Sequence, residues 1–268
     1  MEGIKTIRVE LPSDLESIEI VPLGDSHIGD EYSDKSLLRS VVDYVLEKEN
    51  RYVVLNGDMV NNAIRSSVSD VYEEQMSPEL QVWQIVEILK PIKDRILAMG
   101  TGNHEERTLK ETGLDPSRYI AVRLGIEERY SKNSFVLFVK VGTSHTSTKS
   151  RLKQQVYSIF CFHGYGGGKK LGGKANNLVD SNRIIANADL YIMGHTHTPL
   201  IHPDRTFEVD EQNMALREKK RYYLIHNAFL KFGGYGLRQG FAPTSRDITY
   251  ATLYTQGRKQ ITVTLGIK

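Results

Sequence analysis

Hydrophobic residues in the first half of the chain follow two different periods. Short apolar or alternating stretches predict strands, whereas apolar residues that recur every three or four positions predict helices with one buried face. The predicted strands span residues 17–23, 51–55 and 95–99. The predicted helices run over 34–49, from Ser77-Pro78 to about Leu89, and onward from Asp115-Pro116. Strand and helix therefore alternate in this half.

The pattern also predicts details of the first two helices. Ser33 can cap the first helix, because its hydroxyl oxygen can accept a hydrogen bond from a free N–H group of the first turn. The second helix is expected to bury a stripe of apolar residues, namely Leu80, Val82, Trp83, Ile85, Val86 and Leu89.

The second half is richer in strands. Strands are predicted over 134–141, 156–162, 188–193, 222–228, 248–254 and 261–265, with one helix over 174–187. Alternating strands and helices followed by several strands predict an α/β fold in which two sheets pack face to face with helices outside.

Composition and length are those of a globular protein. The chain has 268 residues, of which 40% are hydrophobic and 25% are charged. No linker rich in proline, serine or glycine divides it, which predicts a single domain over residues 1–268. No apolar run is long enough to cross a membrane, no signal sequence is recognisable, and Cys161 is the only cysteine. We therefore expect a cytoplasmic protein with no membrane partner.

Charge is unevenly distributed, although the net charge is only +2. Residues 131–179 contain no Asp or Glu, but they contain Lys132, Lys140, Lys149, Arg151, Lys153, Lys169, Lys170 and Lys174. Such a segment favours an anionic ligand. A solvated basic surface is the alternative interpretation.

Polar groups follow the predicted strands at five places. They are Asp25-Ser-His27, Asn56-Gly-Asp58, Gly102-Asn-His-Glu105, His163-Gly164 and Gly194-His-Thr-His197. Strand ends in layered α/β folds are where loops converge and ligands bind. One such group alone is more often a turn or a packed histidine than a ligand. Five in succession predict a shared metal site.

The ordered set of groups resembles the calcineurin-like metallophosphoesterases. Their motif order is Asp-x-His, Gly-Asp, Gly-Asn-His-Glu/Asp, His and Gly-His-x-His, and each motif is present here within residues 18–198. The resemblance implies a four-layer αββα sandwich with two central mixed β-sheets. Residues 199–268 match no motif and are expected to complete the second sheet.

The resemblance also implies a site for two divalent cations. One would be bound by Asp25, His27, Asp58 and His197, and the other by Asp58, Asn103, His163 and His195. Carboxylate and imidazole donors suit Mn, with Fe and Zn as alternatives. A metal-bound hydroxide would attack phosphorus in line while His104 assists the leaving group. Glu105 would orient a neighbouring ligand.

Three positions depart from the Ser/Thr protein phosphatases of this family. Asn61 replaces the aspartate that pairs with the catalytic histidine, and Asn62 and Thr101 replace arginines that grip a terminal phosphate. The departures favour a phosphodiesterase or nuclease related to recombination exonucleases. The alternatives are a phosphomonoesterase or protein phosphatase, and a metal-binding scaffold without turnover.

Two glycine-rich segments are candidates for substrate binding. In residues 163–174, Tyr165 could stack on a base, while Lys169, Lys170 and Lys174 could contact DNA or a nucleotide. A solvated loop is an equally good interpretation. A nucleotide-binding P-loop is disfavoured because Ala175 stands where a hydroxyl is required. In residues 233–244, Arg238 could border the substrate cleft, although a loop that only connects strands is the favoured interpretation. His145, His202 and His226 are interpreted as structural.

Overall fold

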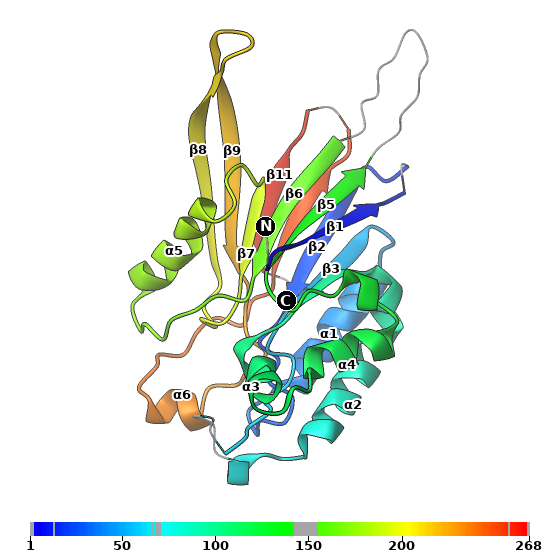
Figure 1. The fold of residues 1–268 in the computed structure, drawn as a ribbon, viewed down its shortest axis with the longest axis vertical. Helices are drawn as coiled ribbons and strands as arrows, with labels where there is room; N and C mark the ends of the chain where they lie inside the picture. Colours follow the sequence, from blue (N-terminus) through cyan, green and yellow to red (C-terminus); the bar gives the residue numbers. More distant parts are fainter. Residues whose placement is uncertain are drawn as a thin grey trace.

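The computed structural model describes residues 3–12, 14–65, 67, 71–141, 155–256 and 258–266. Two mixed β-sheets form its centre, and helices lie on the outer faces of both (Figure 1). Within the described residues, no helix combines the length and the apolar character that crossing a membrane requires. The cytoplasmic location stays a prediction.

One sheet has five strands in the order β11-β10-β2-β3-β4. They are β2 (Ser17–Leu23), β3 (Arg51–Asn56), β4 (Ile96–Gly100), β10 (Thr249–Tyr254) and β11 (Ile261–Leu265). The first three run parallel, and β10 pairs antiparallel with both β2 and β11. All six residues of β3 are buried, as expected for a strand covered on both faces.

The other sheet has six strands in the order β1-β5-β6-β7-β9-β8. They are β1 (Lys5–Glu10), β5 (Phe135–Val141), β6 (Gln155–Phe162), β7 (Leu190–Met193), β8 (Leu200–Asp210) and β9 (Ala215–Ile225). Strands β6, β7 and β9 run parallel, and β8 pairs antiparallel with β9. The β8–β9 hairpin extends beyond its neighbours (Figure 1).

Three apolar clusters hold four layers together, which confirms the predicted αββα sandwich. Between the sheets, Ile18, Val54 and Ile159 belong to one buried cluster. The outer face of the five-stranded sheet packs against α1 (Lys35–Leu46), α2 (Pro78–Leu89) and α4 (Pro116–Leu124). The outer face of the six-stranded sheet packs against α5 (Leu171–Asp180), which contributes Leu178.

The remaining helices are short or lie in the loops. They are α3 (Asn103–Thr112), α6 (Gly234–Arg238) and the 3-10 helices η1 (Val71–Glu73), η2 (Lys90–Arg95), η3 (Glu127–Arg129) and η4 (Ser181–Arg183). Helix α3 begins directly after β4, within one of the predicted ligand motifs. The sequence patterns predicted neither α3 nor α6, nor the first strand β1.

Several predicted details of the helices are wrong. Asp34, not Ser33, caps α1 by accepting from the N–H of Leu37 at 3.1 Å, because the Ser33 hydroxyl instead donates to the Ser26 carbonyl at 2.8 Å. On α2, Leu80 is 56% exposed and Trp83 is 41% exposed. Helix α5 begins at Leu171, earlier than predicted, and ends at Asp180.

The buried face of α2 is shifted because it carries a polar residue. Gln81 is fully buried and accepts a hydrogen bond from the backbone N–H of Asn62. An apolar stripe cannot show that a glutamine will be drawn inward by such a partner.

The chain after residue 198 contributes to both sheets. Strands β8 and β9 belong to the six-stranded sheet, and β10 and β11 belong to the five-stranded sheet. The segment was expected to complete the second sheet, and β8 and β9 do lie at the edge of the six-stranded sheet; the two strands that it adds to the five-stranded sheet were not expected. Strand β10 pairs with β2 at the centre of the five-stranded sheet, and β11 pairs with β10 at its edge.

Candidate metal centre

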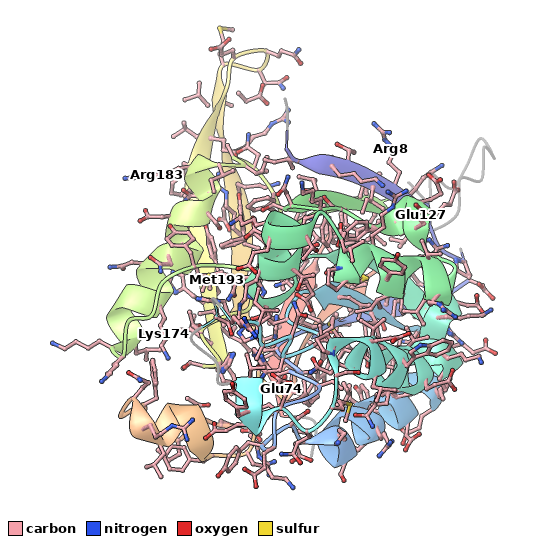
Figure 2. All side chains as sticks on the ribbon, turned by 60° about the horizontal axis from the view of Figure 1, so that its bottom comes forward. Arg8, Glu74, Glu127, Lys174, Arg183 and Met193 are labelled. Atoms are coloured by element: carbon pink, nitrogen blue, oxygen red, sulfur yellow. The ribbon has the colours of Figure 1, made fainter. Side chains whose placement is uncertain are left out.

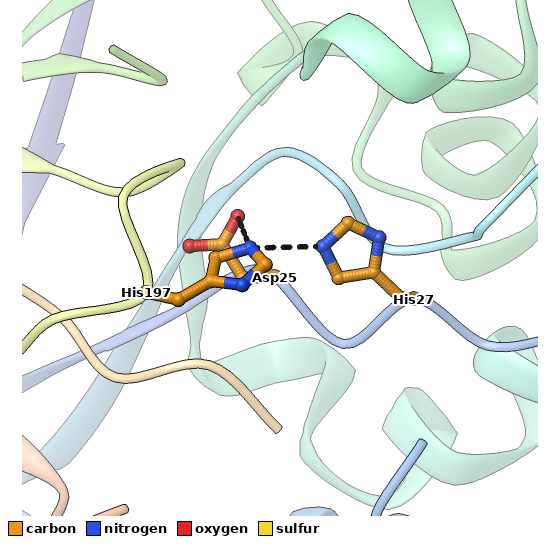
Figure 3. A group of neighbouring side chains, drawn as sticks. All are labelled: Asp25, His27 and His197. Carbon is orange, nitrogen blue, oxygen red and sulfur yellow. Dashed lines mark hydrogen bonds and ion pairs between the residues drawn. The ribbon is translucent and has the colours of Figure 1, made fainter. Parts of the chain in front are cut away.

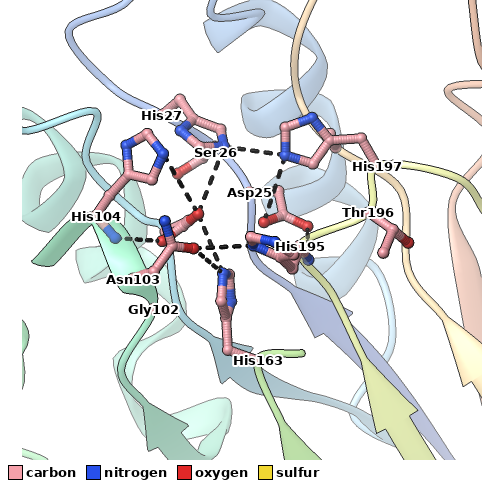
Figure 4. A network of polar contacts seen from close by, with 12 residues as sticks. Asp25, Ser26, His27, Gly102, Asn103, His104, His163, His195, Thr196 and His197 are labelled. Carbon is pink, nitrogen blue, oxygen red and sulfur yellow. Dashed lines mark hydrogen bonds and ion pairs between the residues drawn. The ribbon is translucent and has the colours of Figure 1, made fainter. Parts of the chain in front are cut away.

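Seven side chains that follow five strands meet at one place. Figure 4 labels all of them except Asp58. Asp25 and His27 follow β2, Asp58 follows β3, Asn103 follows β4, His163 follows β6, and His195 and His197 follow β7. They are the residues predicted as metal ligands. Their convergence follows from the topology, since the carboxyl ends of β2, β3 and β4 lie at one edge and those of β6 and β7 face them.

The first group consists of Asp25, His27 and His197 (Figure 3). The Nε2 atoms of His27 and His197 are 3.1 Å apart, and His197 Nε2 is 3.7 Å from Asp25 Oδ1. Asp25 Oδ1 is buried without a hydrogen-bond partner. A buried carboxylate oxygen with no donor beside two imidazole nitrogens fits a bound cation.

The second group consists of Asp58, His163 and His195. Asp58 Oδ2 is 3.1 Å from His163 Nε2, and Asn103 Oδ1 lies 3.0 Å from His163 Nε2 and 2.9 Å from His195 Nδ1. Asp58 Oδ2 is also 3.8 Å from His27 Nε2, in the first group. Asp58 thus lies between the two groups, where a bridging carboxylate belongs.

Hydrogen bonds to the backbone orient two of the histidines. His163 Nδ1 lies 2.8 Å from the Asn56 carbonyl oxygen, and His104 Nδ1 lies 2.7 Å from the Asn61 carbonyl oxygen. Because a carbonyl can only accept, each Nδ1 carries the proton and donates it. In the neutral imidazole, each Nε2 then presents a lone pair to the site.

The backbone is strained at most of the ligands. Positive φ angles, which only glycine adopts freely, occur at Asp25 (50°), His27 (42°), Asp58 (49°), His195 (64°) and His197 (51°). The left-handed conformation costs about 1–2 kcal/mol for each such residue. Strain concentrated on one set of polar side chains indicates a functional site. Here it turns side chains from separate loops toward one point.

Electrostatics keep both aspartates charged. Burial opposes their ionisation, but neighbouring histidines outweigh it: His197 and His226 hold the pKa of Asp25 well below its usual range, and His104 and His163 do the same for Asp58. Conversely, although burial lowers it, the pKa of His163 rises to about 10 beside Asp58. Two buried carboxylates among imidazoles are a suitable donor set for divalent cations.

Glu105 holds the Asp58 loop without facing the ligands. Its carboxylate accepts from the backbone N–H groups of Asp58 (3.0 Å), Met59 (2.6 Å), Val60 (3.1 Å) and Gly102 (3.2 Å). Burial and the charge of Asp58 raise the pKa of Glu105 to about 7, while its backbone donors act in the opposite direction. This arrangement matches the orienting role that was predicted for Glu105.

Glycine is required where the Asp58 and Asn103 loops touch. A Cβ atom on Gly102 would lie 2.1 Å from Asp58 Oδ1, and one on Gly57 would lie 2.3 Å from the Gly102 nitrogen. Both distances are far inside van der Waals contact. Gly57 also has a φ of 83°.

His226 lies directly behind Asp25 and is fully buried. Its Nδ1 is 3.8 Å from Asp25 Oδ2 and donates to the Asn227 carbonyl at 2.8 Å. A Cβ atom on Gly194 would lie 2.4 Å from His226 Nε2, so the ring supports the His195 loop as well. His226 was predicted to be structural, but its contact with the site was missed. Its position just after β9 repeats the pattern seen at the ligands.

The residues at the three positions that depart from the protein phosphatases make hydrogen bonds within the protein. Asn61 receives the His104 hydrogen bond with its backbone carbonyl. Asn62 Nδ2 donates to the His104 carbonyl at 2.7 Å and to Thr108 Oγ1 at 2.8 Å. Thr101 Oγ1 is 2.8 Å from the Tyr130 hydroxyl. Neither Asn62 nor Thr101 offers a cation to a phosphate.

The predicted substrate residues have different surroundings. Lys174, labelled in Figure 2, is buried and donates to the Thr196 carbonyl at 3.0 Å and to Thr198 Oγ1 at 2.5 Å. It therefore supports the loop that carries His195 and His197. Arg238 forms a two-pronged ion pair with Glu73, at 2.9 and 2.7 Å. Tyr165, Lys169 and Lys170 are exposed.

Among the described residues of the acid-free segment, basic side chains lie at two separate places. Lys140 lies near the end of β5 that is remote from the ligands and pairs with Glu10 at 3.1 Å. Lys169 and Lys170 follow His163, beyond the opposite end of the antiparallel pair formed by β5 and β6. Lys149, Arg151 and Lys153 fall outside the described residues, as does His145. His202 is exposed and its ring lies 5.9 Å from that of Tyr223.

Fold and site together define a class: a layered α/β protein with Asp, His and Asn donors for divalent metal ions at its strand ends. The chain belongs to the calcineurin-like phosphoesterases, whose family model matches residues 18–199. This confirms the family resemblance seen in the motifs. A search of curated proteins found no match.

The solved structures that are similar to this chain are distant. A predicted phosphoesterase from Streptococcus pneumoniae TIGR4 is 15% identical with a TM-score of 0.37, covering 94% of this chain and 91% of that one. A metallophosphoesterase from Sphaerobacter thermophilus is 13% identical with a TM-score of 0.41, covering 92% and 88%. The calcineurin-like phosphoesterase YfkN from Bacillus subtilis is 11% identical with a TM-score of 0.37, covering 93% and 90%. Similarities of this size say nothing about the substrate.

Proposed function

We propose that this protein hydrolyses phosphodiesters, with nucleic acid as the substrate class, in a reaction that requires two divalent cations. The observation that carries the proposal is the convergence of the complete donor set around Asp58 Oδ2, which lies within 3.8 Å of His27, His104 and His163. A scaffold that had lost its activity would not need to keep every donor.

The residues divide into cation ligands and one group for proton transfer. Asp25, His27, Asp58 and His197 would hold one cation, and Asp58, Asn103, His163 and His195 would hold the other. When bound, such a pair supplies a nucleophilic hydroxide near neutral pH and neutralises charge on the phosphate. We propose Mn as the cation, with Fe and Zn as alternatives, because the donors mix carboxylate, imidazole and amide groups.

His104 is proposed to give a proton to the leaving oxygen. Its Nε2 faces Asp58 Oδ2 at 3.8 Å, and its Nδ1 is fixed on the Asn61 carbonyl. With Nδ1 held in this way, the proton at Nε2 is the one that can be transferred. Burial lowers the pKa of His104, although the charge of Asp58 acts against this.

A diester is favoured over a monoester because no arginine occupies the phosphate-gripping positions. A monoester carries one more ionisable oxygen, which a planar guanidinium binds well. Here Asn62 and Thr101 make internal hydrogen bonds instead. The exposed Lys169 and Lys170, which follow the ligand His163, supply positive charge suited to a polyanionic strand.

The proposal is tested by comparing bis(p-nitrophenyl) phosphate with p-nitrophenyl phosphate, with Mn²⁺ added, and then single- and double-stranded DNA. We expect the diester to be hydrolysed with the higher kcat/KM, and activity to be lost on chelation. A preference for the monoester would favour the alternative, a phosphomonoesterase or protein phosphatase. No turnover of any ester, with metal bound, would favour the scaffold.

A further inference from the structure

The hydrogen bond that fixes His104 ends on a backbone carbonyl that is itself tightly held. That carbonyl belongs to Asn61, which is also bound at two other atoms. Its backbone N–H donates to the Ile28 carbonyl at 2.9 Å, and its Nδ2 donates to Glu74 Oε1 at 2.6 Å. Glu74 Oε1 also accepts from the backbone N–H of Ala63 at 3.1 Å. Glu74 therefore grips the chain on both sides of Asn62.

The peptide group between Asn61 and Asn62 makes hydrogen bonds at both its N–H and its C=O. Its N–H donates to Gln81 Oε1 at 2.8 Å, while its C=O accepts from His104. Gln81 in turn donates from Nε2 to Glu74 Oε2 and, at 3.0 Å, to the Met76 carbonyl. Gln81 is fully buried on α2, and a Cβ on Gly29 would lie 2.3 Å from its Nε2. The amide therefore has one orientation and little room to shift.

We propose that Glu74 and Gln81 are positioning residues for His104, acting through the Asn61–Asn62 peptide. The inference rests on the proposed function, in which His104 protonates the leaving group. Asn61 stands where the related protein phosphatases have an aspartate beside this histidine. Here a carboxylate acts on the histidine indirectly. Glu74, labelled in Figure 2, accepts a hydrogen bond from the Asn61 side chain, and the Asn61 carbonyl accepts one from His104 Nδ1.

The physical reason is that a general acid acts only from a defined position. The Asn61 carbonyl sets the direction of the His104 ring, because the ring is anchored at Nδ1 and reaches the site with Nε2. A displacement of about 1 Å can cost on the order of 100-fold in rate. Releasing Asn61 from Glu74, or Asn62 from Gln81, frees the peptide to rotate and so moves His104 Nε2.

The test measures the dependence on the leaving group, because misplacing a general acid slows the departure of a poor leaving group most. Two methyl aryl phosphodiesters are compared with Mn²⁺ present, one releasing p-nitrophenol and the other the less acidic phenol. For Glu74→Gln we expect kcat to fall roughly 10-fold further for the phenyl ester than for the p-nitrophenyl ester. KM and metal content should be unchanged.

Two controls separate positioning from general disruption. Glu79→Gln makes the same chemical change at an exposed residue of α2 and should leave the ratio of the two substrates unaltered. In a His104→Ala background, Glu74→Gln should not change the ratio further, because the two residues act through one group. If Glu74→Gln fails to fold, Gln81→Met, which keeps the buried volume, carries the same test.

The outcomes distinguish this inference from the proposed function. An equal loss for both esters, or a ratio change that persists without His104, would leave Glu74 a purely structural residue and overturn the inference alone. A His104→Ala variant with an unaltered ratio would overturn the general-acid role proposed for His104, and a wild-type protein inactive on diesters would overturn the proposed hydrolysis. Either result would overturn this inference as well.

Discussion

Glu105 Oε2 accepts a hydrogen bond from the backbone N–H of Asp58 at 3.0 Å, and this contact joins the first turn of α3 to the central ligand. The other carboxylate oxygen accepts from Met59 and Val60. The Glu105 side chain thus fixes the backbone of Asp58, which lies between the two candidate groups.

The first prediction is that Glu105→Gln weakens metal binding. The glutamine amide would point a donor at backbone N–H donors, so the Asp58 loop would lose part of its support. We expect metal affinity to fall by about 10–100-fold, as for other residues that orient ligands, measured by calorimetric titration with Mn²⁺. Glu106→Gln, at an exposed ion pair with Lys110 on the same helix, is the control. Equal affinities for the two variants would contradict the role of Glu105.

Asp58→Asn should remove both activity and metal. An amide keeps the shape of the side chain but cancels the charge that two cations would share. We expect elemental analysis after gel filtration to show a loss of metal and the diester assay to show no turnover. Asp43→Asn, at an exposed position of α1, should behave like the unchanged protein. Full activity of Asp58→Asn would refute a bridging carboxylate.

His104→Ala should separate chemistry from metal binding. His104 is not among the side chains assigned to either cation, so metal content should persist. Loss of a general acid typically costs about 100–10,000-fold in rate, and kcat should fall within that range. The measurement is steady-state kinetics with the p-nitrophenyl diester at saturating Mn²⁺. Normal turnover would remove His104 from the mechanism.

Lys174→Met should act on the loop of His195 and His197, not on substrate binding. The ammonium group donates to the Thr196 carbonyl and to Thr198 Oγ1, and the Thr198 hydroxyl donates to the same carbonyl at 3.0 Å. Removing the ammonium group therefore removes two hydrogen bonds from a charged donor, each of which contributes about 1.5–3 kcal/mol. We expect a lower melting temperature and weaker metal binding, with KM unchanged at saturating metal. Lys48→Met, at an exposed position that the proposed function does not use, is the matched control. A raised KM with unaltered metal affinity would restore Lys174 as a substrate contact.

The sequence predicted which side chains would converge at the candidate metal centre because their signal is local. Each ligand stands within a few residues of an apolar strand, and parallel strands bring such ends together. The contacts that support the ligands are not local. Glu74 lies in a segment without periodicity, and its partner Asn61 is thirteen residues away. Lys174 sits among other lysines, and only the fold buries it beside Thr196. Gln81 interrupts the apolar pattern of α2, and its hydrogen-bond partner, the backbone N–H of Asn62, lies on a distant loop.

Asp189 is remote from the candidate metal centre. Its ion pairs should make the free energy of unfolding depend on pH only in strong acid. Its carboxylate accepts from Lys219 at 2.9 Å, from Lys259, and from the N–H of Ser158 at 2.8 Å. Burial alone would raise the pKa of Asp189, but the lysines and Ser158 hold it below its usual value. The stabilisation is therefore present above the unfolded-state pKa of about 3.9 and is lost as the pH falls through the lower folded-state value.

Asp189→Asn should lower the free energy of unfolding by about 1–3 kcal/mol at pH 7. In urea denaturation, the difference in the free energy of unfolding between the unchanged protein and Asp189→Asn should stay constant from pH 7 to 5 and become smaller only in stronger acid. The control is Asp180→Asn, at an exposed pair with Arg183, which should show no comparable difference. A difference that disappears between pH 7 and 5 would mean that another group carries the effect.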